Sequence, residues 1–117
     1  MKYETDDNLK LVESGAIKYD NGKVRAYQGL VNYFPRALNS VAEVSTFGAN
    51  KYAHWNGWKD VDDGFNRYRN ALFRHSLAFS SGEAIDPDSK LLHLAHEAWN
   101  SLASLELYLK ENEKEVE

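Results

Sequence analysis

The sequence has 117 residues, 43% of them hydrophobic and 27% charged, and its formal net charge at pH 7 is −4. This length suits a single domain, 1–117, with one modest core, and the composition excludes a disordered chain. Because the chain has no cysteine, a disulfide framework, a thiolate zinc site and a thiol nucleophile are also excluded.

Membrane proteins, secreted proteins and duplex-binding proteins do not fit the sequence either. No apolar run reaches the length of a membrane span, and the polar N-terminus is not that of a signal peptide. The net negative charge argues against duplex nucleic acid, although basic residues gather locally and suit a small anionic ligand. We therefore expect a cytoplasmic protein that binds a small molecule.

In the N-terminal third, the sequence predicts no regular element apart from a weak helix near residues 8–14. Turn-forming residues recur there without clear alternation of polar and apolar positions, so we expect an irregular loop. Its basic residues Lys18, Lys23 and Arg25 either hold phosphates from several directions or are solvated loop charges. Residues 1–14 and 111–117 are expected to be frayed ends.

Residues 35–52 predict the first helix. Pro35 suits the first helical position, and apolar residues recur on one face of the expected helix. Gly48 lies within this pattern and costs roughly 1 kcal/mol relative to alanine, so either close packing or a ligand demands a glycine there. The loop that follows carries Trp55 and Trp58, whose indoles either stack on a base or cover an edge of the core.

A second helix is predicted to start at one of the aspartates in 60–63 and to run to about residue 80. His75 lies in the middle of its apolar stripe, where an imidazole must find a buried hydrogen-bond partner. Arg67 and Arg74 share an adjacent face and either bind phosphates or are solvated.

The third helix is predicted from Asp88 or Ser89, as its N-cap, to Leu109. It is apolar almost all round, which is typical of a central helix. Five polar residues form one narrow band along it: His93, His96, Glu97, Asn100 and Ser104. The band is expected to face a partner or a pocket. Its imidazoles either share a metal, grip an anion, move a proton or simply bind neighbouring helices.

Together these patterns predict an all-α protein, a small helical bundle with an irregular N-terminal third. Three helices of this size bury a thin core, and the third is apolar nearly all round. We therefore expect the bundle to be completed by oligomerisation into a homodimer or higher oligomer.

Five motifs in the same order resemble the phage and prophage dATP/dGTP diphosphohydrolase N-terminal-domain family. They are KYDNGKVR at 18–25, Pro35-Arg36-Ala37-Leu38, FGANKY at 47–52, Trp55-Asn56 and RHSLAFSSGEAIDPDSKLLHLAHEAWN at 74–100. The resemblance covers about residues 15–109 and implies action on purine deoxynucleotides, in a host cell's cytoplasm if the chain is phage-encoded. The family that the chain resembles is itself distantly similar to the all-α MazG-like nucleotide pyrophosphatases.

The chain departs from the MazG-like metal pattern, in which clustered carboxylates on two helices bind Mg²⁺. Its first helix offers only Glu43, and His93-Leu94-Ala95-His96 stands where Glu-x-x-Asp is expected. Imidazole suits Zn²⁺ or Mn²⁺ better than Mg²⁺. Lys90 also stands where the family pattern has a glycine.

The resemblance and the residues leave three functions open. The first is an enzyme that cleaves a phosphoanhydride bond of a purine (d)NTP, a nucleoside triphosphate diphosphohydrolase. The second is a non-catalytic protein that sequesters a nucleotide, such as a cyclic or signalling nucleotide of host immunity. The third, a helical adaptor without a ligand, is least consistent with the basic loop and the histidine band.

For the enzyme we expect a divalent metal, Mg²⁺, Mn²⁺ or Zn²⁺, held by His75, His93 and His96. The expected catalytic residues are His93, His96 and Glu97, and Glu83, Asp86 and Glu97 are expected to be auxiliary metal ligands or the base. The residues expected to bind the nucleotide are Lys18, Lys23, Arg25, Lys51, Tyr52, Trp55, Asn56, Arg74, His75 and Asn100. All are expected to converge on one pocket, completed by the 18–25 loop.

Overall fold

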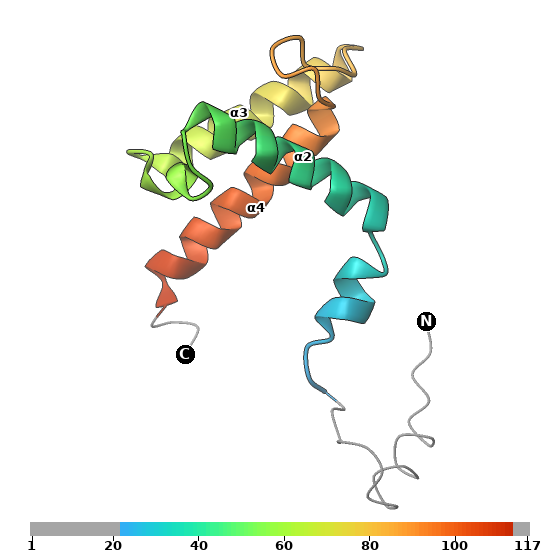
Figure 1. Cartoon of the computed structure of the whole chain (residues 1–117), viewed down its shortest axis with the longest axis vertical. Helices are drawn as coiled ribbons and strands as arrows, with labels where there is room; N and C mark the ends of the chain where they lie inside the picture. Colours follow the sequence, from blue (N-terminus) through green and yellow to red (C-terminus); the bar gives the residue numbers. More distant parts are fainter. Residues whose placement is uncertain (1–21, 114–117) are drawn as a thin grey trace, which may run out of the picture. The chain divides into compact units, whose positions relative to one another are not determined.

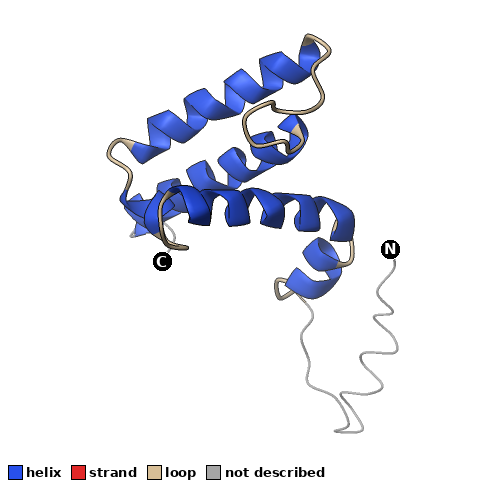
Figure 2. Ribbon diagram, turned by 45° about the horizontal axis from the view of Figure 1, so that its top comes forward, coloured by secondary structure: helices blue, strands red, loops and turns tan. Residues whose placement is uncertain are grey.

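A computed structural model of the chain describes residues 22–113. The weak helix predicted near residues 8–14 lies outside this range. The chain divides into two compact units, Met1–Tyr33 and Phe34–Glu117. The predicted all-α class is confirmed, because every regular element in residues 22–113 is a helix and Figure 2 draws no strand. None of these described helices is long and apolar enough to cross a membrane.

The described part of the first unit contains one π-helical turn, η1 (Tyr27–Val31). The Asn32 N–H donates to the Tyr27 carbonyl at 2.9 Å, and the Gly29 N–H donates to the Arg25 carbonyl at 2.7 Å. The prediction of an irregular loop is therefore wrong for these residues. A single turn closed by local hydrogen bonds needs no amphipathic repeat, so periodicity does not reveal it.

The second unit begins with helix α2 (Pro35–Lys51), and its predicted start at Pro35 is confirmed. A short 3₁₀ turn, η2 (Gly57–Asp60), separates α2 from α3 (Gly64–Ser80). Of the three aspartates predicted to start α3, Asp63 is the N-cap residue. Its left-handed backbone (φ 53°) turns the chain into the helix, and its carboxylate accepts a hydrogen bond from the Asn66 amide at 3.0 Å.

Helix α3 ends in a Schellman motif at Gly82. The Glu83 N–H donates to the Ala78 carbonyl and the Gly82 N–H to the Phe79 carbonyl, both at 3.0 Å. Gly82 has a φ of 103°, which a glycine adopts without steric cost. The motif turns the chain back toward α3 and fixes the position of Glu83.

The segment between α3 and α4 is a closed loop. The Asp86 N–H donates to the Leu91 carbonyl at 2.8 Å, and Ile85 and Leu92 form an isolated antiparallel bridge. Lys90 adopts the left-handed region, with a φ of 66°.

Helix α4 (His93–Glu111) therefore starts later than predicted. Neither Asp88 nor Ser89 is its N-cap, because the left-handed Lys90 interrupts any helix before Leu92. The hydrogen bond that suggested a cap is instead made by Asp86, whose carboxylate accepts from the Ser89 N–H at 3.0 Å within the turn.

Helix α4 packs mainly against α3 and also contacts α2, which crosses it in Figure 1. The polar band of α4 faces inward. Within residues 22–113, the buried apolar side chains include Val44, Tyr68, Ala95 and Ala103, and the buried polar side chains include His93, His96, Asn100 and Ser104. Three leucines that were expected to make α4 a central helix, Leu94, Leu102 and Leu109, are 50%, 50% and 42% exposed in the single chain. This interior is unusually polar for a small helical unit.

Candidate functional site

A cavity of about 670 Å³ opens between α2, α3 and the inward face of α4. This main cavity is within the size range of small-molecule sites. Its lining residues are Val44, Phe47, Gly48, Lys51, Tyr52, Val61, Arg67, Tyr68, Ala71, Arg74, His75, Asp86, Asp88, His96, Trp99 and Asn100.

Three exposed cations stand around the main cavity, from two helices. Lys51 is at the end of α2, while Arg67 and Arg74 lie two turns apart on α3. Guanidinium and ammonium groups placed in this way suit a ligand that carries several anionic oxygens. Of the described lining residues, only Asp86 and Asp88 carry carboxylates.

Beside the cavity, a chain of hydrogen bonds joins Glu83, His93 and His75. The His93 Nε2–H donates to the Glu83 carboxylate at 2.6 Å, which leaves the lone pair on His93 Nδ1. His93 Nδ1 lies 2.8 Å from His75 Nδ1, so His75 donates and finds the partner that its apolar surroundings require. A carboxylate that fixes the tautomer of a histidine in this way is a common support for a metal ligand.

A second chain joins Asp86, Ser89 and His96. The Ser89 hydroxyl donates to the Asp86 carboxylate at 2.7 Å, and Ser89 Oγ lies 2.6 Å from His96 Nε2. Since the hydroxyl proton is used, His96 Nε2–H donates to Ser89, and the lone pair of His96 is on Nδ1. Ser89 Oγ also accepts the Leu91 N–H at 3.2 Å, so both of its lone pairs are filled and it is not a free nucleophile.

The chemistry of these groups depends on their protonation. Burial first, and then the neighbouring His96, lowers the pKa of His75 to about 4. Burial is also the main cause that lowers the pKa of His96. Burial raises the pKa of Asp86, but the two hydrogen bonds from Ser89 and the nearby His96 outweigh it, so the pKa is lowered overall. At neutral pH His75 and His96 are therefore neutral imidazoles, and Asp86 is an ionised carboxylate.

One cluster in the described residues has the spacing of a metal site. His75, Asp86 and His93 each offer a ligand atom, and these atoms lie within 4.8 Å of one another. Two imidazoles and a carboxylate suit Zn²⁺ or Mn²⁺, whereas Mg²⁺ favours oxygen ligands. The sequence led us to expect His75, His93 and His96 as metal ligands and Asp86 as an auxiliary ligand. In the structure the third member of the cluster is Asp86, and His96 Nε2 hydrogen-bonds to Ser89.

A smaller cavity of about 230 Å³ adjoins the main one and shares Gly48, Tyr52 and Trp99 with it. The remaining lining residues of this side cavity are Ser45, Ala49, Trp55, Asn56 and Trp58. Trp58 and Trp99 meet edge to face with ring centroids 5.6 Å apart, and the Trp99 indole N–H donates to Ser45 Oγ at 2.9 Å. The aromatic loop thus forms a wall next to the cations and histidines.

Comparison with known proteins gives one match. The family described as dATP/dGTP diphosphohydrolase, N-terminal, matches residues 11–117, nearly the whole chain. The chain belongs to this family. No curated protein and no solved structure matches the chain.

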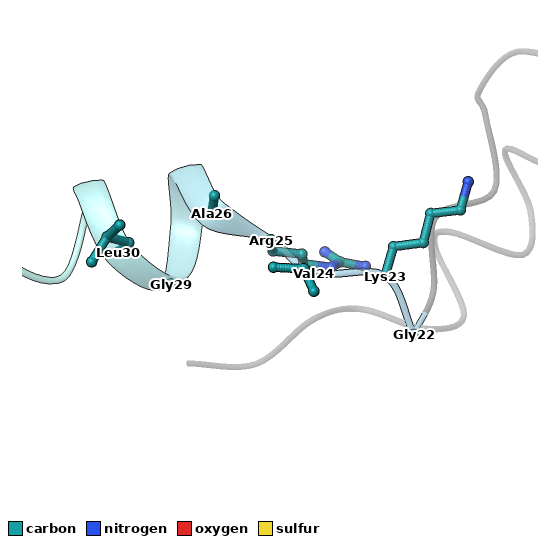
Figure 3. A pocket seen from close by; sticks show the side chains of 7 residues that line it. All are labelled: Gly22, Lys23, Val24, Arg25, Ala26, Gly29 and Leu30. Carbon is teal, nitrogen blue, oxygen red and sulfur yellow. The ribbon is translucent and has the colours of Figure 1, made fainter. Parts of the chain in front are cut away.

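In this diphosphohydrolase-family chain, the expected ligand-binding residues divide into three groups. Lys51, Tyr52, Arg74, His75 and Asn100 line the main cavity, and Trp55 and Asn56 line the side cavity. Lys23 and Arg25 belong to the first unit, where they line a hollow of about 610 Å³ beside η1 (Figure 3). Lys18 lies outside the described residues. That the 18–25 loop completes the main cavity stays a prediction.

The other band residues lie apart from the cluster. Asn100 donates to the His96 carbonyl and Ser104 to the Asn100 carbonyl, both at 2.8 Å, so these buried groups are satisfied within α4. Glu97, expected to be catalytic, is not among the described residues that line either cavity. His93 is 3% exposed and lies behind His75.

Three residues at or beside the main cavity were not selected from the sequence as principal site residues. They are Ser89, which was taken as a helix cap, Arg67, and Asp86, which was taken as an auxiliary group. The Asp-Pro-Asp-Ser run was the available signal, since aspartate and serine in a turn commonly hydrogen-bond each other.

Proposed function

We propose that the chain binds a purine (deoxy)nucleoside triphosphate in the main cavity and cleaves a phosphoanhydride bond there. The main support for this proposal is that three cations and a metal-capable cluster border one cavity, in a chain that belongs to a nucleotide-hydrolase family. Lys51, Arg67 and Arg74 neutralise the phosphates and hold them in place.

The cluster of His75, Asp86 and His93 would hold the divalent metal, and the ion would replace the hydrogen bond in which the His93 Nδ1 lone pair accepts from His75. Such an ion supplies a Lewis acid for phosphoryl oxygens and lowers the pKa of water. Glu83 positions His93 through the 2.6 Å hydrogen bond, so it acts as an orienting residue and not as a ligand.

His96 is the proposed general base. Its Nδ1 lone pair accepts a proton from the attacking water, and the oxygen of that water forms a bond to the α-phosphorus. The bond from this phosphorus to the bridging oxygen breaks, and pyrophosphate leaves with the bond's electron pair. The protonated His96 is then stabilised by Asp86, whose carboxylate lies 3.7 Å from Nε2 and is also linked to it through Ser89.

A second function, sequestration without cleavage, is favoured by the scarcity of carboxylates. Only two line the main cavity among the described residues, and Glu43 of α2 is exposed and does not line it. In this case the cations and aromatic residues would hold a cyclic or signalling nucleotide intact.

Incubation of the protein with dATP, dGTP and cyclic dinucleotides in Mg²⁺, Mn²⁺, Zn²⁺ or EDTA tests both proposals. The products are separated by chromatography. Monophosphate and pyrophosphate, formed by wild type and lost in His96→Ala, support hydrolysis. Ligand that is bound and returned intact under every metal condition rejects hydrolysis and supports sequestration, while failure to bind any of these compounds rejects both.

A further inference from the structure

The two cavities differ sharply in charge. Lys51, Arg67, Arg74, Asp86 and Asp88 line the main cavity, whereas no charged residue is among the described residues that line the side cavity. A ligand that occupies both therefore has one strongly anionic end and one neutral end. A nucleotide has this division between its phosphates and its base.

Gly48 stands where the two cavities meet, on the α2 wall of both. A glycine inside a helix is unfavourable relative to alanine, so a reason for it is expected. Close packing is not that reason. Apart from the backbone of α2 itself and the adjacent residues, no described heavy atom lies within 4 Å of the position that a Cβ would take here. Backbone conformation is not the reason either, since Gly48 has no positive φ. What the glycine preserves is the open space between the two cavities.

The side cavity has the chemistry of a base-binding subsite. Trp55, Trp58 and Trp99 offer π-faces, and Trp55 is 64% exposed, so that its indole is accessible to a ligand. The Asn56 side-chain amide has both donors and an acceptor for the edge of a base. With a volume of about 230 Å³ the side cavity is smaller than a complete ligand site and suits one part of a ligand.

We infer that the side cavity binds the base of the nucleotide, which reaches it from the main cavity over Gly48 and stacks on the tryptophans. This inference rests on the proposed nucleotide function and adds the position of the base. Stacking alone tolerates any base, so a preference for purines arises here from their larger π-face and from Asn56.

Intrinsic fluorescence is a useful probe, because all three tryptophans of the chain line the side cavity, and Trp55 and Trp58 do not line the main cavity, whereas Trp99 lines both. We expect dATP and dGTP to change wild-type fluorescence, and inorganic tripolyphosphate to bind by calorimetry without a comparable change. Trp55→Ala should weaken dGTP binding about 5- to 150-fold, the range for one stacked base, and leave tripolyphosphate binding unchanged. Phe73→Ala, which removes an exposed aromatic residue outside both cavities, is the matched control.

A second pair of variants tests whether the open space over Gly48 connects the two cavities for the ligand. Because a leucine side chain fills more of this space than a methyl group, the affinity of Gly48→Leu for dGTP should be about 10-fold lower than that of Gly48→Ala. Both variants should retain the helical circular dichroism of wild type.

The outcomes separate the two proposals. Suppose dGTP binds in calorimetry but leaves the fluorescence unchanged, and Trp55→Ala binds it like wild type. The base subsite is then rejected and the nucleotide function stands. If neither dATP nor dGTP binds wild type, both proposals are rejected.

Discussion

The imidazole rings of His75 and His96 stack face to face, with centroids 4.3 Å apart and planes within 5° of parallel. One ring comes from α3 and the other from α4, so the packing of these two helices sets their separation. His75 belongs to the metal-capable cluster and His96 to the chain that ends at Asp86. The stack therefore places the proposed metal site and the proposed proton acceptor in direct contact.

Removing the Glu83 carboxylate should weaken metal binding although Glu83 is not a ligand. Loss of such an orienting partner typically lowers metal affinity 10- to 100-fold. We expect this loss for Zn²⁺ or Mn²⁺ in Glu83→Gln, measured by calorimetry. Glu106→Gln, an exposed glutamate of α4, is the control. Equal affinity in Glu83→Gln and wild type would show that His93 needs no orientation by Glu83.

Arg74→Ala should reduce nucleotide affinity. A charge-assisted hydrogen bond to phosphate contributes about 1.5–3 kcal/mol, which corresponds to a loss of roughly 10- to 150-fold. Arg69→Ala is the matched control, because Arg69 lies on the same helix beside Phe73 and does not line the main cavity. Similar losses in both variants, measured by calorimetry at one salt concentration, would point to general electrostatics instead of a site.

Tyr68→Phe should destabilise the protein and simplify its alkaline titration. The Tyr68 hydroxyl donates to the Trp58 carbonyl, and leaving that acceptor unpaired costs about 1–3 kcal/mol. Burial first, and then Tyr52, raises the pKa of Tyr68 to about 12. The unfolded chain therefore loses this proton at lower pH than the folded chain, and the stabilisation disappears as pH rises from about 10 to about 12.

Urea unfolding at several pH values, with tyrosinate absorbance, measures both effects. In Tyr68→Phe the tyrosine that titrates last in wild type should be missing. A titration curve that loses an ordinary tyrosine near pH 10 would contradict the buried hydrogen bond.

Lys90→Gly should stabilise the protein by about 1 kcal/mol. Lys90 has a φ of 66°, a conformation that costs a residue with a Cβ about 1–2 kcal/mol and costs glycine little. Lys90→Ala is the control, since it removes the ammonium group but keeps the backbone strain. Thermal unfolding should show a higher midpoint for the glycine variant only. A similar gain in Lys90→Ala would assign the effect to the side-chain charge.

Self-association through α4 is a further expectation. Leu94, Leu105 and Tyr108 lie on one face of α4 and are 50%, 53% and 45% exposed in the single chain. Covering such a face is a common reason for a homo-oligomer. We expect wild type to sediment as a dimer or larger and Leu105→Glu to sediment as a monomer, with Glu106→Gln as control. A monomeric wild type at micromolar concentration would reject the expectation.

The sequence alone determined helices α2, α3 and α4, apart from the start of α4, and the faces of their residues, because hydrophobic periodicity and a proline at a helix N-terminus act locally along the chain. It predicted Pro35 as a helix start, it placed His75 among apolar neighbours, and it grouped His93, His96, Asn100 and Ser104 in one band. It also identified Gly48 as a glycine inside a helix, which is unfavourable and therefore calls for an explanation from packing or from a ligand.

Only the tertiary structure decided which atoms meet. Asp86 joins His75 and His93 because Gly82 and the left-handed Lys90 fold the intervening loop back onto α3 and α4, and no periodicity encodes such a loop. In the same loop, Ser89 hydrogen-bonds to Nε2 of His96, a contact that the helical pattern does not predict. The choice between packing and ligand at Gly48 also required the structure, since open space next to a residue depends on elements distant in the sequence.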